Sequence, residues 1–563
     1  MTSEERTDTT AARSLLLTGI REHAILRGDK HFLAAPDGSR LSWLVDLRRV
    51  LLQGKYLAAF VELFWERYKN ASSFQVCGLE TAAIPLITAI VMSSLERGTP
   101  VNGFIVRRER KTYGTANQIE GHLNDFPVVI VDDLLNSGQS MEKVRVVLDE
   151  AGHLVDSVYV VLDFQARRGL EWRKRWALRV DAITTLNELG LSQPMREPAP
   201  PLATFREVWS FASPSPNWSE RVPKSFPVID GARIYFGSDC GMFWCLDTRD
   251  ASVVWSFRVH SDGHKNIWSS PALRDGHVYF GAYDGNVYSR DALTGAEIWR
   301  FEGADWVGSS PVLAPDLGLL FIGLEFAEEH HRGSIMALSL RTGEPVWEHP
   351  TRRFTHASPA YWPAERVVAC GSNDNELFLL DALTGAVRWR FETQSDAGKG
   401  SIRHAPAFDL ERRQLVTGCS NGDIYIIDVD SGRELWTVRT GNTVYTVPLV
   451  VNGFAYVGST DKYMYILDLD RRKVHTRLYI GSKVYGPARL LLGRIYFGAC
   501  NGVIYELSPS THKITGKHQV ADGITNALTC DPEIGRLYAL TYTNKLFAFD
   551  RDEDVIFTPK TSL

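Results

Sequence analysis

The stretch that decides the fold of the first third of the chain is Val128-Val129-Ile130-Val131-Asp132-Asp133-Leu134-Leu135-Asn136-Ser137-Gly138-Gln139-Ser140. Its apolar start predicts a buried strand that carries two adjacent carboxylates, Asp132 and Asp133, to the carboxyl edge of a sheet, where open α/β folds bind ligands. The small-residue loop from Asn136 to Ser140 leads into a helix expected to begin near Met141. Backbone N–H groups, hydroxyls and a helix N-terminus then converge, which predicts a phosphate site. Two acids there would repel phosphate unless a ribose diol or Mg²⁺ lies between them. The alternative is an ordinary buried strand with a polar turn.

Short apolar strands and helical patterns alternate on both sides of this stretch, at residues 74–77, 82–96, 101–106, 141–151 and 157–162. This alternation is typical of an α/β domain with a parallel sheet. We expect that domain to span residues 1–192. A proline-rich linker follows over residues 193–203, because prolines remove helix and ladder donors. The remainder, residues 204–563, has a different pattern.

That remainder contains a repeat that aligns on itself. A glycine is followed ten residues later by an aspartate, and in most repeats a tryptophan follows eight residues after that, as in Gly237/Asp247/Trp255, Gly281/Asp291/Trp299, Gly371/Asp381/Trp389, Gly418/Asp428/Trp436 and Gly458/Asp468. Repeats of about 40 to 48 residues made of short strands predict an all-β propeller. The alignment gives about eight blades, with seven left open. We expect 204–211 to pair with the strands near 546–550 and close the ring.

Composition limits the class of protein. The 563 residues are 44% hydrophobic and 23% charged, without an apolar stretch long enough for a membrane span. The apolar patch Leu15-Leu16-Leu17 is too short for a secretory signal. The seven cysteines form no CxxC pair, which indicates reduced thiols and argues against a zinc site. We therefore expect a cytoplasmic protein without a membrane partner, and the net charge of −5 gives no reason to expect a nucleic-acid partner.

The stretch at 128–140 resembles the signature of type I phosphoribosyltransferases that binds phosphoribosyl pyrophosphate (PRPP). The resemblance implies that Asp132 and Asp133 face the ribose hydroxyls and that Asn136, Ser137, Gly138, Gln139 and Ser140 hold the 5′-phosphate.

Two further segments resemble the orotate phosphoribosyltransferases. Residues 76–86 are similar to their pyrophosphate loop, which implies that role for Gly78, Leu79, Glu80 and Thr81. Residues 106–121 are similar to their mobile catalytic loop, with Arg107, Arg108 and Lys111 where that family has basic residues and Tyr113 where a histidine is common. Taken alone, Gly78 is consistent with a simple turn and the basic run with a solvated surface.

The resemblance implies an enzyme, a PRPP-dependent phosphoribosyltransferase. It would displace pyrophosphate at the anomeric carbon of PRPP through an oxocarbenium-like transition state, with Mg²⁺ carried by PRPP and no direct protein ligand to the metal. The acceptor is nucleobase-like or related but unidentified, and Ala35 stands where the orotate enzymes have a lysine for their acidic base. The resemblance also implies a homodimer. A non-catalytic PRPP or nucleotide sensor with the propeller as its output is the alternative.

The turns of the repeat, as in Asp291-Ala292-Leu293-Thr294-Gly295-Ala296-Glu297-Ile298-Trp299, resemble those of quinoprotein (PQQ-repeat) propellers. We interpret the tryptophans as packing between blades. The chain lacks the vicinal cysteine pair of quinone-dependent alcohol dehydrogenases, so we expect no pyrroloquinoline quinone, and a quinone-dependent oxidoreductase is the third hypothesis. Glu328-Glu329-His330-His331 is interpreted as an exposed turn in preference to a metal site. We assign the propeller to binding a protein partner or a bulky acceptor at one rim.

Overall fold

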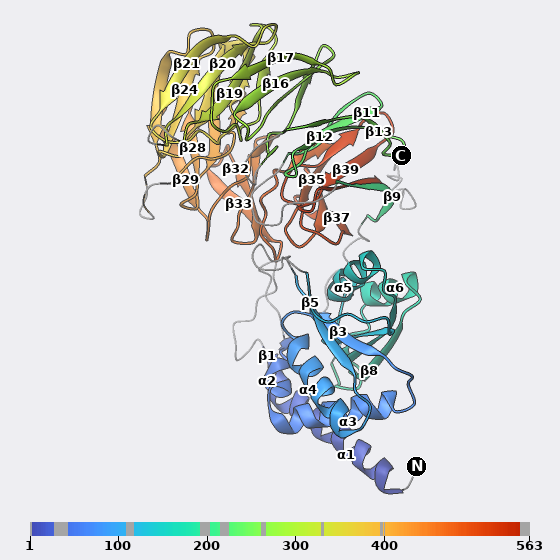
Figure 1. Cartoon of the computed structure of the whole chain (residues 1–563). Helices are drawn as coiled ribbons and strands as arrows, with labels where there is room; N and C mark the ends of the chain where they lie inside the picture. Colours follow the sequence, from blue (N-terminus) through green and yellow to red (C-terminus); the bar gives the residue numbers. More distant parts are fainter. Residues whose placement is uncertain are drawn as a thin grey trace, which may run out of the picture. The chain divides into compact units, whose positions relative to one another are not determined.

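The computed structural model of the chain describes residues 3–27, 43–108, 118–191, 203–213, 225–259, 266–327, 331–394, 398 and 400–551. The chain divides into two compact units, one made of residues 1–199 with 519–521 and the other of the remaining residues up to 563 (Figure 1). Apart from Ala203, the expected linker lies outside the described residues, so its limits stay a prediction.

The first unit is built on a six-stranded sheet of order β5-β4-β3-β6-β7-β8. Its strands are β3 (Gln75–Leu79), β4 (Asn102–Val106), β5 (Ile119–Gly121), β6 (Val128–Leu135), β7 (Val155–Asp163) and β8 (Arg179–Thr185). Five of them run parallel, and only β5 at the edge is antiparallel. The predicted α/β domain with a parallel sheet is confirmed, and β6 lies between β3 and β7.

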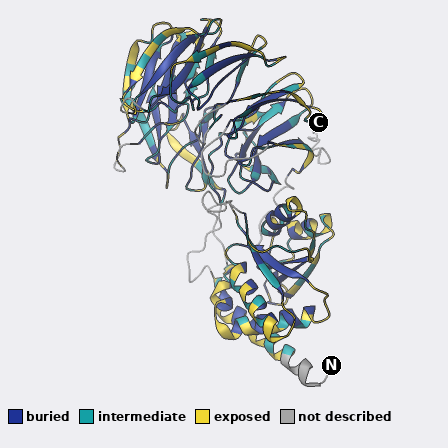
Figure 2. Ribbon diagram, viewed as in Figure 1, coloured by how far each residue is buried: buried dark blue, intermediate teal, exposed yellow. Residues whose placement is uncertain are grey.

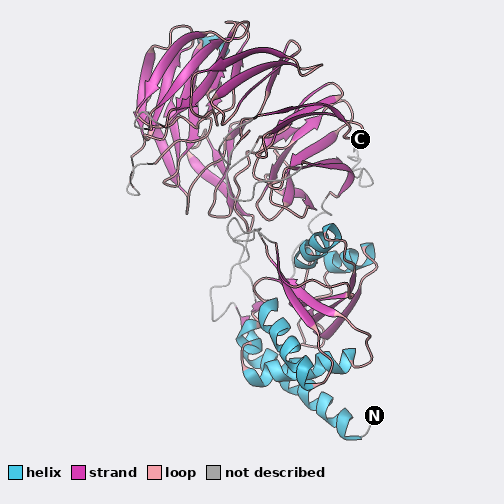
Figure 3. Ribbon diagram, viewed as in Figure 1, coloured by secondary structure: helices cyan, strands magenta, loops and turns pink. Residues whose placement is uncertain are grey.

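Helices cover both faces of this sheet (Figure 3). They are α1 (Ser3–Gly19), the π-helix η1 (Ile20–Ala24), α2 (Arg48–Leu51), α3 (Gly54–Tyr68), α4 (Ala83–Glu96), α5 (Gln139–Glu150) and α6 (Arg167–Arg175), and a short ladder pairs β1 (Ile25–Arg27) with β2 (Trp43–Val45).

Strand β6 shows why the sheet is covered on both sides. Its alternate residues belong to different cores: Val129 and Val131 pack with α1, α3 and α4, and Val128 and Ile130 pack with α5 and α6. All four are essentially inaccessible, so a continuous apolar run is needed here in place of an alternating one (Figure 2). Burial of each such side chain contributes about 1.5–3 kcal/mol to the stability of the fold.

The second unit is a propeller of eight four-stranded sheets. The blades are, in order, β10 (Val228–Asp230), β11 (Arg233–Gly237), β12 (Met242–Asp247), β13 (Val253–Arg258); β14 (Ala272–Arg274), β15 (His277–Gly281), β16 (Asn286–Asp291), β17 (Glu297–Glu302); β18 (Val312–Ala314), β19 (Leu319–Glu325), β20 (Gly333–Ser339), β21 (Pro345–Thr351); β22 (Ala360–Trp362), β23 (Val367–Gly371), β24 (Glu376–Asp381), β25 (Val387–Glu392); β26 (Ala407–Asp409), β27 (Gln414–Gly418), β28 (Asp423–Asp428), β29 (Glu434–Arg439); β30 (Leu449–Val451), β31 (Phe454–Gly458), β32 (Tyr463–Asp468), β33 (Lys473–Tyr479); β34 (Arg489–Leu491), β35 (Arg494–Gly498), β36 (Val503–Leu507), β37 (Ile514–Gln519); and β38 (Thr529–Asp531), β39 (Arg536–Leu540), β40 (Lys545–Arg551), β9 (Phe205–Ala212). Eight blades is therefore the correct count.

The last blade closes the ring as predicted. Its outer strand β9 comes from before the first blade and pairs antiparallel with β40, with Trp209 opposite Ala548 and Phe211 opposite Leu546. Closure removes two sheet edges that would otherwise expose unpaired backbone groups.

The repeated turn explains how neighbouring blades pack. Asp291 Oδ1 accepts hydrogen bonds from the backbone N–H groups of Leu293 and Thr294, which fixes the turn. Gly295 has φ +74°, and a Cβ there would lie 2.6 Å from the Trp255 ring of the preceding blade. Trp255 in turn donates from Nε1 to the carbonyl of Ala292 at 3.0 Å. The interpretation of the tryptophans as inter-blade packing is confirmed.

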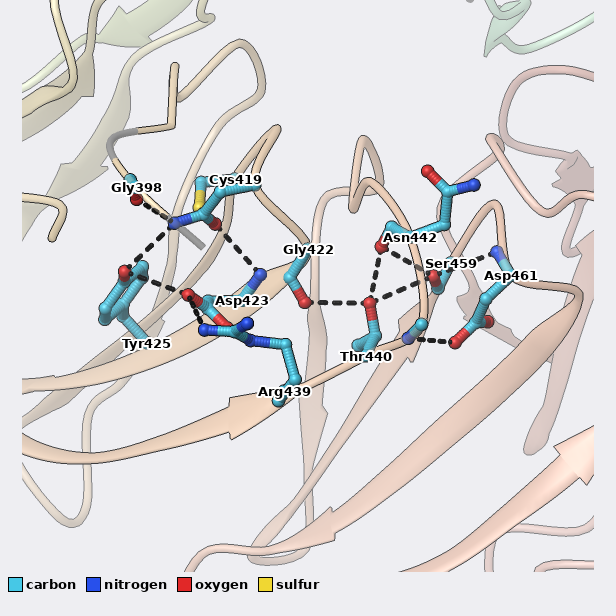
Figure 4. Close-up of polar contacts among 12 residues, drawn as sticks. Gly398, Cys419, Gly422, Asp423, Tyr425, Arg439, Thr440, Asn442, Ser459 and Asp461 are labelled. Atoms are coloured by element: carbon cyan, nitrogen blue, oxygen red, sulfur yellow. Dashed lines mark hydrogen bonds and ion pairs between the residues drawn. The ribbon is translucent and has the colours of Figure 1, made fainter. Parts of the chain in front are cut away.

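Polar contacts also join successive blades, as between blades 5 and 6 (Figure 4). Ser459 Oγ of blade 6 donates to Thr440 Oγ1 at 3.2 Å, and the Gly441 amide donates to Asp461 Oδ2 at 2.7 Å. The fully buried Asp423 is neutralised within blade 5 by Arg439. These loops are satisfied internally.

Candidate functional site

The acidic pair lies near the carboxyl end of the central strand β6. Asp132 is 6% exposed and Asp133 is half-buried. The Asp133 backbone amide donates to Asp132 Oδ1 at 2.9 Å, which holds the Asp132 side chain against the backbone of the next residue.

Both carboxyl groups are electrostatically strained. Burial raises the pKa of Asp132, and the neighbouring Asp133 charge raises it further, whereas Arg108 opposes the shift. Burial also raises the pKa of Asp133, opposed by hydrogen bonds and by the charge of Arg48. Such a pair is suited to a partner that brings hydroxyl donors or a cation. Its oxygen donors are of the kind that Mg²⁺ prefers, so the residues fit a magnesium ion carried in with a substrate.

The loop after β6 forms the start of helix α5. Gly138 is the N-cap residue, with φ +81°, and no side chain caps the helix. The N-terminus of α5 is therefore left to bind an anion through backbone N–H groups. Asn136 to Gly138 form the loop, and Gln139 and Ser140 already belong to the first turn of α5, which begins two residues before the expected Met141.

Helix α6 holds this loop in place. A Cβ on Gly138 would lie 2.6 Å from the Trp172 ring, and a Cβ on Gly169 would lie 2.4 Å from the Asn136 carbonyl oxygen. Trp172 also donates from Nε1 to Glu142 on α5 at 2.7 Å. Sequence reasoning missed Gly169 and Trp172, because nothing in the chain marks them as neighbours of a loop some 30 residues earlier.

The predicted pyrophosphate loop ends the neighbouring strand β3 and precedes α4. Gly78 and Leu79 belong to β3, and Glu80 and Thr81, joined by a cis peptide bond, follow it. A Cβ on Gly78 would lie 2.4 Å from the Val131 carbonyl oxygen. Glycine is thus required by the close approach of β6, independently of any role in binding.

The basic residues Arg107 and Arg108 follow β4, next to β3, and both contact Glu80. The Arg108 amide donates to Glu80 Oε1 at 3.0 Å, and its Nε donates to the Glu80 carbonyl at 3.1 Å. Arg107 Nη1 lies 3.5 Å from Glu80 Oε2, and its Nε lies 2.9 Å from Glu120. Glu80, expected to face pyrophosphate, here pairs with the cations expected to do the same. Lys111 and Tyr113 lie outside the described residues.

The structure therefore gathers three of the predicted segments at the carboxyl ends of adjacent parallel strands β4, β3 and β6. Sequence reasoning missed the pairing of Glu80 with the arginines. It also missed the electrostatic influence of Arg48 on Asp133.

Two kinds of feature are absent from the described residues. No helix there is both long and apolar enough to cross a membrane. No group of three or more His, Cys, Asp and Glu side chains in that part of the chain is placed to hold a metal ion. Of the charged turn at 328–331, only His331 is described.

Comparison with known proteins gives separate matches for the two units. Residues 202–369, 331–440 and 373–560 match the family described as outer membrane protein assembly factor BamB. The orotate phosphoribosyltransferase of Methanocaldococcus jannaschii is 32% identical over 152 residues, covering 27% of this chain and 82% of the relative. That of Corynebacterium glutamicum strain R is 30% identical over 182 residues, covering 32% and 95%. BamB from Moraxella catarrhalis superposes with a TM-score of 0.50 and 16% identity, over 62% of this chain and 100% of that structure, which shows a shared fold.

Proposed function

Because the chain belongs to the orotate phosphoribosyltransferase family through its first unit and to the BamB-described propeller family through residues 202–560, we propose that it is a PRPP-dependent phosphoribosyltransferase whose propeller binds the acceptor or a protein partner. One observation carries the proposal: an acidic pair with raised pKa values, Asp132 buried and Asp133 half-buried, lies beside a helix N-terminus without a side-chain cap at the carboxyl edge of a parallel sheet.

Binding of PRPP would use both features of this edge. The ribose 2′- and 3′-hydroxyls would donate to Asp132 and Asp133, which lowers the energetic cost of keeping the two carboxylates charged. The 5′-phosphate would accept from the backbone N–H groups of Asn136 to Ser140 and gain from the dipole of α5.

The chemical step is displacement at the anomeric carbon. The acceptor atom forms a bond to C1′, and the bond from C1′ to the pyrophosphate oxygen breaks, so the electron pair leaves with pyrophosphate. Arg107, Arg108 and Lys111 would stabilise the charge that develops there, and Mg²⁺ bound with the pyrophosphate supplies additional charge neutralisation. Hydrogen bonds to charged groups contribute about 1.5–3 kcal/mol each, so a few of them account for several powers of ten in rate.

Glu80 has to give up its contacts with Arg107 and Arg108 before those side chains can hold pyrophosphate. This pairing favours a second candidate, a PRPP sensor in which the arginines stay engaged by Glu80 and no transfer follows.

The acceptor is proposed to be a nucleobase-like molecule other than orotate, because Ala35 offers no cation for an acidic base. Residue 35 lies outside the described residues. We also propose a homodimer and a cytoplasmic location; all seven cysteines are free, in keeping with a reducing compartment.

The experiment is to incubate the full chain with PRPP, Mg²⁺ and a panel of nucleobases and to measure pyrophosphate release. Asp132→Asn with Asp133→Asn should abolish release, and Asp125→Asn, an exposed carboxylate in the loop before β6, should leave it unchanged. PRPP binding without pyrophosphate release from any acceptor would favour the sensor.

A further inference from the structure

The propeller has a cavity of about 650 Å³ that the proposed transfer reaction does not use. Its walls come from one end of blades 3 and 4: the loops between their second and third strands and the connections that leave their fourth strands. A volume of this size is within the range of small-molecule sites, about 300–1,000 Å³.

One arginine of the cavity is already neutralised by the protein. Arg352 donates from its backbone N–H to Asp374 Oδ2 at 3.0 Å and from Nη2 to Glu376 Oε1 at 2.9 Å. Glu376 is also bound by Arg390 at 3.2 Å, and both carboxylates are buried. The two positive and two negative charges of this group balance, as Asp423 and Arg439 do in blade 5 (Figure 4).

Two further arginines of the cavity have no such partner. Arg353 and Arg403 are exposed, and within the described part of the chain neither guanidinium forms an ion pair. Arg403 lies 6.0 Å from the centre of the Tyr445 ring, which orients it without cancelling its charge. The cavity therefore has two uncompensated positive charges, and guanidinium groups match phosphate and carboxylate in shape.

Two other groups limit the chemistry of a ligand. The side-chain oxygen of Asn373 is buried and, among the described residues, has no hydrogen-bond partner, so it calls for an N–H or O–H donor. The Phe354 ring, half-buried and packed against Trp306 at 5.8 Å between centres, offers an aromatic surface.

We propose that this cavity binds a small anionic molecule of about nucleotide size, with a phosphate or carboxylate held by Arg353 and Arg403, a flat ring against Phe354 and a donor to Asn373. The assignment uses the propeller alone and does not depend on the transfer reaction.

The test is isothermal titration calorimetry on the full chain. Uridine 5′-monophosphate tests the phosphate and 5-aminoisophthalate tests the carboxylate; each has a flat ring and an N–H donor. The cavity variant is Arg353→Gln with Arg403→Gln. Its matched control is Arg341→Gln with Arg366→Gln, which removes the same charge from exposed side chains in loops at the other end of the blades.

At least one probe should bind the wild-type chain. The cavity variant should weaken that binding by a factor of ten or more, and the control should change it by less than a factor of two. Asn373→Asp should also weaken that binding, because the new carboxylate repels an anionic ligand.

Three results would overturn the proposal: neither probe binds, the cavity variant binds as tightly as the wild type, or binding is lost with Asp132→Asn and Asp133→Asn in place of the cavity variant. The last result would locate the probe in the first unit. A fourth result, binding of a hexaglutamate peptide and of neither small probe, would refute a small-molecule site.

Discussion

Replacement of Glu80 by glutamine should tighten the binding of magnesium pyrophosphate. In the structure Glu80 contacts Arg107 and Arg108 at distances of 3.0–3.5 Å. The change keeps the size of the side chain, an oxygen acceptor for the Arg108 amide and the backbone carbonyl that accepts from Arg108 Nε. It removes the negative charge that competes with pyrophosphate for the Arg107 guanidinium.

The magnitude follows from the exposure of this cluster. The side chains of Arg107 and Glu80 are 27% and 25% exposed. A full Coulomb energy at 3.5 Å is about 5 kcal/mol at an effective dielectric constant of 20, but desolvation and screening leave about 0.5–1 kcal/mol for pairs of this kind. Removing the charge that holds Arg107 should therefore gain about 0.5–1 kcal/mol, or about 2- to 5-fold in affinity.

The assay is calorimetric titration of magnesium pyrophosphate and of PRPP into the wild type and Glu80→Gln. The matched control is Glu62→Gln, which removes a carboxylate on α3 paired at 2.5 Å with Arg97, the residue that follows α4. The control should leave both affinities unchanged. If Glu80→Gln weakens binding while urea unfolding shows an intact fold, Glu80 acts as a ligand of the substrate complex and the competition described here is wrong.

Three other predictions follow from packing and titration. Gly138→Ala should lower PRPP affinity at least tenfold, because it adds left-handed strain of about 1–2 kcal/mol and a clash with the Trp172 ring. The control Gly98→Ala, at a glycine with φ +70° and open space around it, should add the strain alone and leave the affinity unchanged in the same titration. The pKa values of Asp132 and Asp133 are raised in the fold, so their contribution to stability is full below their unfolded pKa values near 4 and is lost as pH rises through the folded values. Urea unfolding from pH 4 upward should therefore show the stability of the wild type falling relative to that of the double Asn variant. Trp299→Ala should destabilise the propeller by about 3–5 kcal/mol in urea unfolding, through lost packing and an inter-blade hydrogen bond.

The propeller could be predicted almost completely because its sequence repeats. Asp291 accepts hydrogen bonds from its own turn, and Gly295 is the left-handed residue against which Trp255 packs. Because residues of these types recur at a fixed spacing, the sequence itself indicates where each blade lies. The closing strand was predictable because residues 204–211 have the pattern of the last strand of a blade but precede the first complete blade.

The candidate site was predictable where one contiguous segment contains all of its parts. Asp132 and the loop that follows it are such a segment, so strand, acids and helix start could be inferred together. The contacts of Glu80 with Arg108 depend on β3 lying beside β4, and the clamp of Trp172 on Gly138 depends on where α6 docks. Neither the pairing of these strands nor the position of α6 can be inferred from the residues next to them in the sequence.

The most direct test of the central claim is calorimetric titration of PRPP with Mg²⁺ into the full chain and into the variant Asp132→Asn with Asp133→Asn. The account predicts one site per chain in the wild type and loss of that binding in the variant, because the ribose hydroxyls lose both acceptors. Absence of binding in the wild type, or equally tight binding by the variant, would contradict it.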